Sequence, residues 1–285
     1  MQESRGTTAP YDGSSATGRA DPGYPARLLL SSIVAALLAG EAMILVHELF
    51  HALTGLATGD RGTLLPVAWM STGEGASAAG IAVTAAGPVL SLVSGALMMI
   101  WQPLRHRGGF AHLLWMWFAA VSLMEAVGYL VITPLGAGDT ASIVERLGAP
   151  LWAALVMCIL GVAGMFATAR AFAPFVARAT GYEKRPAWAL AFWPWLIATP
   201  VSIGLAILYL LLSPLSLAPA DSIVVSMGST VLFVAAPMSF LFSRRVASTA
   251  EREPLVLPRA PVAGIVALVV LVALKLALTQ GLALG

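Results

Sequence analysis

Residues 28–58 read LLLSSIVAALLAGEAMILVHELFHALTGLAT, a run in which apolar side chains far outnumber polar ones. A helix rises about 1.5 Å per residue, so roughly 20 helical residues cross the hydrocarbon layer of a bilayer, which is about 30 Å thick. This run is long enough to cross that layer with some tilt or protrusion. It therefore predicts a transmembrane helix.

Six further apolar runs follow it, and polar or turn-forming residues such as Pro134, Pro174 and Pro214 separate them where helices are expected to end. Together the runs predict an all-α polytopic membrane protein with about seven transmembrane helices. The six runs cover residues 79–101, 110–133, 150–172, 188–212, 223–242 and 263–282.

The composition agrees with a membrane protein and excludes several other classes. Hydrophobic residues make up 59% of the chain and charged residues 11%, with a mean hydropathy of +0.86, well outside the range of soluble domains. A formal net charge of +2 excludes a nucleic-acid binder, and the single Cys158 excludes a disulfide-stapled domain.

The chain divides into three parts on this evidence. Residues 1–26 are rich in Gly, Ser, Thr, Pro and charge, which predicts a disordered tail and lacks the pattern of a signal peptide. Residues 27–148 form the first three spans and contain the chemistry-bearing motifs described below. Residues 149–285 form a C-terminal region of four spans.

The distribution of basic residues predicts the orientation, because short cytoplasmic loops are enriched in Lys and Arg. A cytoplasmic N-terminus places two of the loop residues on the outer side, Arg61 and Arg146. It places thirteen in the cytoplasm: Arg5, Arg19, Arg27, Arg105, Arg107, Arg170, Arg178, Lys184, Arg185, Arg244, Arg245, Arg252 and Arg259. This bias predicts a multi-pass protein of the plasma membrane with its N-terminus in the cytoplasm.

Ionisable side chains inside a bilayer are costly, so the first run draws attention to Glu41, His47, Glu48 and His51. The last three form a His-Glu-x-x-His pattern. On a helix, His47 and His51 stack about 6 Å apart on one face, where both can bind one metal ion. Glu48 lies beside that ion, in the position that a general base needs to take a proton from water.

A purely structural role is the alternative for these three residues, which could simply hydrogen-bond within a helix bundle. Three titratable groups within five residues of a membrane helix are a costly way to pack, so we favour metal binding. Glu41 and Glu125, deeper in their spans, are expected to hydrogen-bond to neighbouring helices, and Lys275 could pair with either.

Two histidines leave a catalytic zinc site one protein ligand short, because such sites usually have three. The candidates are Glu41, Asp60, Glu74, Glu125, Asp139, Glu145, His106 and His112. Glu125 and Asp139 lie about 20 Å apart along a straight helix, so only one of them is expected to reach the metal. Asp139 is at the depth of the histidines, because the third span ends on their side of the membrane.

The residues before Asp139 favour it as the third ligand. Pro134 ends the third span, and Gly136 and Gly138 allow the backbone to fold back towards the first span. The alternative for Asp139 is a capping residue for a helix that begins near Ala141.

Three segments resemble, in order, the site-2 protease family of intramembrane zinc metalloproteases. HELFH at 47–51 is similar to the zinc motif of that family, and AAGPVLSL at 85–92 is similar to its Gly-Pro segment. Pro134 and Asp139 match the spacing of its Asn-x-x-Pro-x-x-x-x-Asp-Gly motif. The resemblance covers residues 28–148 and implies zinc bound by His47, His51 and Asp139, with Glu48 as the catalytic base.

The chain departs from the family pattern at several positions. Ser91 stands where Asn is common, Val131 replaces the Asn of the third motif and Thr140 replaces its Gly, and the chain has no PDZ-like insertion. Thr133 or a backbone amide is the expected substitute for the missing Asn in holding substrate. The family's site usually opens towards the cytosol, whereas the basic residues here place it near the outer face.

The 60–78 loop, which follows the metal helix, is a second candidate for substrate binding. In the family this position resembles a hairpin that dips into the membrane, and its edge could pair with an unwound substrate strand. The alternative is an interfacial loop with Trp69 at headgroup depth.

The sequence thus predicts a Zn²⁺-dependent metalloendopeptidase that cleaves membrane-protein substrates in or near their transmembrane segments. Its other partner is the lipid bilayer, and no nucleic acid is expected. The alternatives are a non-catalytic membrane protein with a structural or regulatory metal site, and an ion-coupled transporter that uses Glu41 and Glu125.

Overall fold

The computed structural model describes residues 21–72, 78–214, 223, 225–242, 246 and 252–285. Within these residues six helical segments are long and apolar enough to cross a membrane, and a shorter apolar helix, α12 (Val262–Leu278), joins them. The chain is a multi-pass membrane protein, and the predicted all-α architecture is confirmed. The six segments are Tyr24–Ala57, Ala78–Ile100, Gly109–Leu135, Leu151–Thr180, Lys184–Leu212 and Val225–Phe242.

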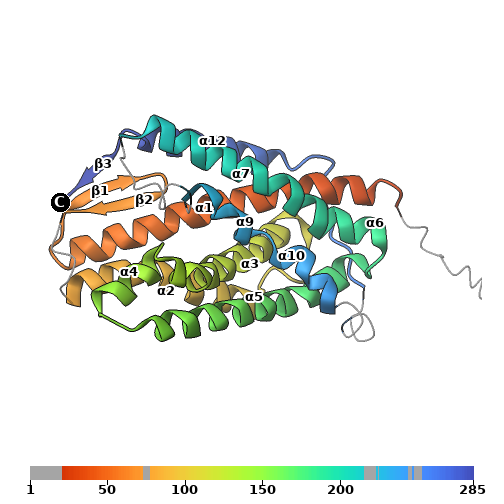
Figure 1. Cartoon of the computed structure of the whole chain (residues 1–285). Coiled ribbons are helices and arrows are strands. Elements are labelled where there is room, and N and C mark those ends of the chain that lie inside the picture. The colour runs from red at the N-terminus through yellow and green to blue at the C-terminus, as the bar shows by residue number, and fades with distance from the viewer. Residues whose placement is uncertain (1–20, 73–77, 215–222, 224, 243–245, 247–251) are drawn as a thin grey trace, which may run out of the picture.

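Helix α1 (Tyr24–Ala57) runs through the middle of the bundle (Figure 1). It packs against α2 (Ala78–Ile100) and α3 (Gly109–Ile132) on one side and against α7 (Trp193–Leu212) and α12 on the other. Helix α5 (Leu151–Thr180) lies outside α3. Because α1 has neighbours on several sides, its polar side chains can be buried without contacting lipid.

Buried aromatic side chains fill the core around α1. Trp117 packs against Phe172 and Phe233, and its indole Nε1 donates to Ser32 Oγ at 2.8 Å. The Ser32 hydroxyl in turn donates to the Leu190 carbonyl at 2.7 Å. These hydrogen bonds satisfy polar groups that have no access to water.

A buried ion pair joins α1 to α12. Lys275 Nζ lies 2.7 Å from Glu41 Oε2, and the Tyr209 hydroxyl of α7 donates to the same oxygen at 3.3 Å. Both charged side chains are buried, and Lys275 also lies over the Tyr209 ring at 4.8 Å. The two charges compensate each other inside the bundle, so Glu41 is occupied by this pair.

Three short strands stand at the end of the bundle where α1 ends (Figure 1). Strands β1 (Gly62–Leu65) and β2 (Ala68–Ser71) form an antiparallel hairpin, and β3 (Leu282–Leu284) pairs antiparallel with the other edge of β1. The order is β2-β1-β3. The predicted hairpin in the 60–78 loop is therefore present, and it gains a third strand from beyond α12.

Several helix ends differ from the sequence prediction. Helix α1 begins at Tyr24, so residues 24–26 of the predicted tail are helical, and residues 1–20 lie outside the described residues. Helix α5 continues past Pro174 to Thr180, although a stop was predicted near 172. Phe175 and Val176 on that extension are buried in the core, and this burial compensates for the hydrogen bond that Pro174 cannot donate.

The fifth and sixth spans are less regular than predicted. The predicted run 223–242 contains short helices instead of one, α9 (Ser229–Leu232) and α10 (Ala235–Met238), followed by a 3-10 turn, η3 (Ser239–Phe242). Lys184–Leu212 consists of α6 (Lys184–Ala187), a π turn, η2 (Trp188–Phe192), and α7.

Candidate metal centre

His47 and His51 lie one turn apart on α1 and are both buried. Their Nε2 atoms are 3.0 Å apart, and the two rings meet edge to face with centroids 4.7 Å apart. The i, i+4 spacing therefore places both imidazoles on one face of the helix, as predicted, and directs them to one point.

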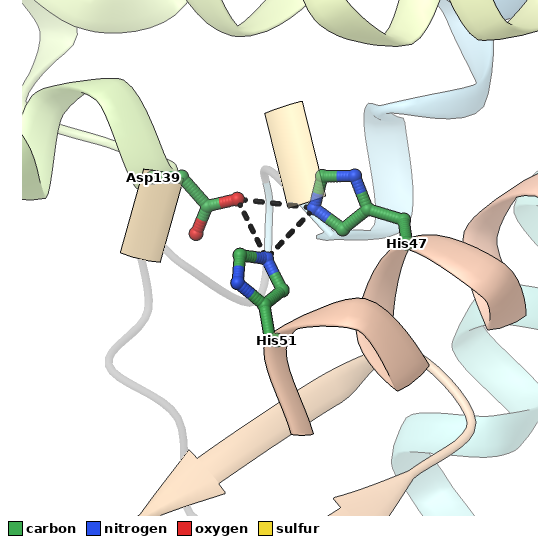
Figure 2. Close-up of side chains that lie close together, drawn as sticks. All are labelled: His47, His51 and Asp139. Atoms are coloured by element: carbon green, nitrogen blue, oxygen red, sulfur yellow. Dashed lines mark hydrogen bonds and ion pairs between the residues drawn. The ribbon is translucent and has the colours of Figure 1, made fainter. Parts of the chain in front are cut away.

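Asp139 completes the group from a different part of the chain. Its Oδ2 lies 3.0 Å from His47 Nε2 and 3.2 Å from His51 Nε2. Figure 2 shows the carboxylate and the two rings pointing at one another across the space between α1 and α4 (Asp139–Arg146). These three residues form a group whose ligand atoms lie within 4.8 Å of one another, as predicted from their common depth in the membrane.

A tight turn brings Asp139 back to α1. The 3-10 turn η1 (Thr133–Leu135) follows α3, and Gly136 and Gly138 then adopt φ values of 73° and 80°. A side chain at Gly138 would also collide with Tyr129, because an added Cβ would lie 2.6 Å from its ring. Glycine is therefore required at 138 both by the backbone angle and by the close approach.

Two threonine hydroxyls hold this turn. Thr133 Oγ1 lies 2.6 Å from Thr140 Oγ1, and the two hydroxyls lie 2.9 and 2.8 Å from the Tyr129 carbonyl, which accepts from this pair. Thr140, which departs from the family pattern, thus stabilises the turn that carries Asp139. Thr133, the candidate substrate-binding residue, is buried in this network.

The hydrogen bonds of the Nδ1 atoms fix how the rings present Nε2. His51 Nδ1 lies 2.6 Å from the Val83 carbonyl, which can only accept, so Nδ1 carries the hydrogen. His47 Nδ1 lies 3.1 Å from Ser91 Oγ, whose own hydrogen goes to the Gly87 carbonyl. Both rings therefore turn a lone pair at Nε2 towards Asp139, the arrangement common among metal-binding histidines.

This donor set fits a metal ion. Two imidazole lone pairs and a carboxylate oxygen at 3.0–3.2 Å repel one another unless a cation lies between them. Ligands about 2.0–2.1 Å from a tetrahedral zinc are about 3.3–3.4 Å apart, so a small outward shift of the side chains suffices. The group could hold a metal ion.

Gly87 of α2 forms one wall of the centre. A Cβ added there would lie 2.4 Å from His51 Nε2 and 2.5 Å from His47 Nε2, too close for any real contact. The absence of a side chain at 87 thus leaves the space next to both ligand atoms open. Gly87 belongs to the segment 85–92, which resembles the Gly-Pro segment of the protease family. This segment borders the metal centre together with α1, which carries the histidines, and α4, which carries Asp139.

Asp139 turns one carboxylate oxygen towards the two histidines, and its side chain is 24% exposed. An ionised carboxylate is a common ligand for divalent cations such as zinc. Helix α4 begins at Asp139 with no side-chain capping bond, so the predicted alternative of a capping residue is not what the structure shows.

Glu48 lies beside the three ligands and is 7% exposed. The backbone amide of Trp69 in β2 is close enough to act electrostatically on its carboxylate. The hairpin therefore lies next to the predicted base. Glu48 does not belong to the group of three ligand residues.

The other candidate ligands lie elsewhere. Glu125 Oε1 is 3.9 Å from His47 Nδ1, on the side of the ring away from Nε2, because α3 packs against α1. Asp60 hydrogen-bonds to Ser71 and to the Arg61 amide. Of the remaining candidates, Glu41 pairs with Lys275, Glu145 and His106 are exposed, His112 is at the other end of α3, and Glu74 lies outside the described residues.

The sequence reasoning missed several residues that orient the centre. Tyr129 stacks on the His47 ring with centroids 5.3 Å apart and planes 16° from parallel. Ser91 and the Val83 carbonyl hold the two Nδ1 atoms. Ser91 could have been found, since it is four residues after Gly87 on the face of α2 that the Gly-Pro segment indicates, but a backbone carbonyl leaves no signal in a sequence.

We expect one zinc ion per chain, and each of the variants His47→Ala, His51→Ala and Asp139→Ala is expected to lose most of it. Each removes one of only three ligand atoms found among the described residues. Elemental analysis of the purified protein measures this directly, with Glu145→Ala as the control for a carboxylate on the same helix as Asp139. Full zinc content in Asp139→Ala would show that another residue is the third ligand.

Comparison with known proteins does not add to this picture. No family model matches the chain, and neither a curated protein nor a solved structure matches it.

Proposed function

We propose that the chain is an intramembrane zinc metalloprotease that hydrolyses peptide bonds in or near transmembrane segments. The observation that carries this proposal is the centre with three ligand residues, His47, His51 and Asp139, beside the buried carboxylate of Glu48. Catalytic zinc sites typically use three protein ligands and keep a position open, whereas structural sites are closed by four.

The residues around the centre have distinct roles in this proposal. Bound zinc would act as a Lewis acid and would lower the pKa of water. Glu48 takes the proton of the attacking water and later gives it to the leaving amine. Ser91 and the Val83 carbonyl keep the two imidazoles in the tautomer that binds metal.

The hairpin supports a mode of substrate binding. In the order β2-β1-β3, strand β2 is an edge strand, and the Trp69 amide on it lies near Glu48. A substrate helix hides its carbonyls in internal hydrogen bonds, so a segment must unwind before attack. An unwound segment that pairs with β2 would lie next to the base, and this is the role we assign to the 60–78 loop.

We also infer that the N-terminus is cytoplasmic and that the protein resides in the plasma membrane, because thirteen of the fifteen basic loop residues favour that orientation. The metal centre then lies near the outer face, because it is at the end of α1 remote from the N-terminus.

The two alternatives predict different behaviour. A structural or regulatory metal site would retain zinc and show no turnover. An ion-coupled transporter would move ions without cleaving peptides, and it would need Glu41, which the structure places in an ion pair with Lys275.

The experiment that tests the proposal reconstitutes the purified chain with a membrane-protein extract and maps new peptide termini by mass spectrometry. We expect new termini within or beside transmembrane segments. They should disappear when a chelator removes the metal and return when zinc is added back. Intact substrates in the presence of a fully zinc-loaded chain would favour the non-catalytic alternative.

A further inference from the structure

A second polar site lies far from the metal centre, in a cavity of about 230 Å³. Its walls come from the loop between α2 and α3, the end of α5 and the segment 253–256. The basic residues of this loop, Arg105 and Arg107, are predicted from the sequence to be cytoplasmic. In the structure they line a cavity.

The cavity is at the opposite end of the bundle from the metal. The Tyr24 hydroxyl, at the start of α1, donates to the Ala179 carbonyl at 2.9 Å and accepts from the Leu255 amide at 3.1 Å, and both of these residues line the cavity. His47 is 23 residues further along α1, which corresponds to about 35 Å. The two sites are therefore separated by roughly the thickness of a membrane.

The charge of the cavity is strongly positive. Among the described residues, the charged side chains that line it are Arg105, Arg107 and Arg178 with a single carboxylate, Glu253. Arg105 Nη2 is 3.8 Å from Glu253 Oε1, a loose pair between two well-exposed groups. Such a pair is weak and easily displaced, so it leaves the arginines able to bind another anion.

The cavity also contains a polar atom that is buried and lacks a partner. His112 is 3% exposed, and its Nδ1 has no hydrogen-bond partner among the described residues. Arg178, beside it, donates to Gln102 Oε1 at 3.1 Å, which uses one of the five N–H groups of a guanidinium. Buried polar atoms are normally hydrogen-bonded, so an unpartnered nitrogen in a cationic cavity indicates a place for an acceptor.

The position and size of the cavity restrict the ligand. Trp101, which begins the α2–α3 loop, is 68% exposed and packs edge to face on Trp115. The Trp115 Nε1 donates to the Met98 and Trp101 carbonyls. Exposed tryptophan is typical of the headgroup layer of a membrane. The volume is below the range of about 300–1,000 Å³ that drug-sized ligands occupy, so a small polar group fits.

We propose that this cavity binds a phosphate group, the chemistry shared by anionic phospholipid headgroups and small soluble phosphates. Arg105 and Arg178 contact the phosphate oxygens, and the His112 ring donates a further hydrogen bond from Nδ1. Arginine suits this role because its planar N–H groups match the geometry of phosphate. The site is independent of the proposed protease activity, since it shares no residue with the metal centre.

The test measures binding to the purified full-length chain in detergent by native mass spectrometry, with phosphatidylglycerol, phosphatidylcholine and inorganic phosphate as separate probes. We expect saturable binding of one phosphatidylglycerol, weakened roughly tenfold or more in Arg105→Gln and Arg178→Gln. His112→Leu, which keeps an apolar volume and removes Nδ1, should weaken binding as well. Arg170→Gln, an exposed arginine on the same helix as Arg178, should bind as the unmodified chain does.

The probes distinguish the two sources of phosphate. If phosphatidylglycerol binds and inorganic phosphate does not displace it, the site is assigned to a lipid headgroup. Binding of inorganic phosphate with the same dependence on Arg105 and Arg178 assigns it to a soluble phosphate. The proposal fails if no probe binds saturably, or if Arg170→Gln weakens binding as much as Arg178→Gln does. Arg105 is in an exposed loop, so its variant keeps the test valid should Arg178→Gln fold poorly.

Discussion

Replacement of Glu48 by glutamine is expected to leave zinc bound and to lower the rate of peptide cleavage by about 100- to 10,000-fold, the usual contribution of a general base. An amide has nearly the same shape as a carboxylate but cannot take a proton from water. The three ligand residues are unchanged in this variant, so metal content and turnover should separate. Zinc analysis and the appearance of new peptide termini measure the two quantities on one preparation.

A matched control for this variant is Glu145→Gln, which changes an exposed carboxylate on α4 near the same end of the bundle. It should cleave at the unmodified rate. Cleavage at that rate by Glu48→Gln would exclude Glu48 as the base and would remove the main support for a protease. Loss of zinc together with activity would instead mean that Glu48 helps to hold the metal.

Replacement of Gly87 by alanine is expected to abolish metal binding although all three ligands remain. The added methyl group would lie 2.4 and 2.5 Å from the two Nε2 atoms, in the space where those atoms must reach an ion. The collision involves ring atoms that hydrogen bonds at Val83 and Ser91 hold in place, so it cannot be relieved by a simple rotation. We therefore expect zinc content near zero and, with it, no turnover.

The control is Gly204→Ala in α7, where an added Cβ meets no atom within 4 Å. Both variants exchange a helical glycine for alanine and so alter helix propensity in the same way. Gly204→Ala should retain zinc and fold normally. If Gly87→Ala also retained a full complement of zinc, the ion would have to lie elsewhere than between His47, His51 and Asp139.

The histidine pair could be predicted from the sequence because it depends only on the local repeat of a helix. Asp139 required a longer argument, from the side of the membrane on which the third span ends and from the proline and glycines before it. That argument worked because each span fixes the depth of its residues in the membrane. The depths of residues far apart in the sequence can therefore be compared. It also left Glu125 out of the ligand set, and Glu125 is indeed absent from the group of ligand atoms.

Other features depend on contacts that leave no trace in the sequence. The pairing of Lys275 with Glu41 could be named only as one of two options, because the order of helices in the bundle was unknown. The extension of α5 past Pro174 reflects burial of Phe175 and Val176, which outweighs a strong local stop signal. The unpartnered Nδ1 of His112 could be recognised only from the structure, where the α2–α3 loop, the end of α5 and the segment 253–256 meet around the cavity that His112 lines.

The third strand has a consequence for the order in which the protein can be assembled. Gly62 pairs with Leu284, a partner about 220 residues later in the chain. During synthesis β1 and β2 are therefore made before all the helices from α2 to α12. Their sheet is complete only when β3 has also been made. A two-stranded hairpin alone is only marginally stable, and contacts between such distant residues form late in folding. The hairpin next to Glu48 thus becomes part of its full sheet only after α12 and β3 have been made.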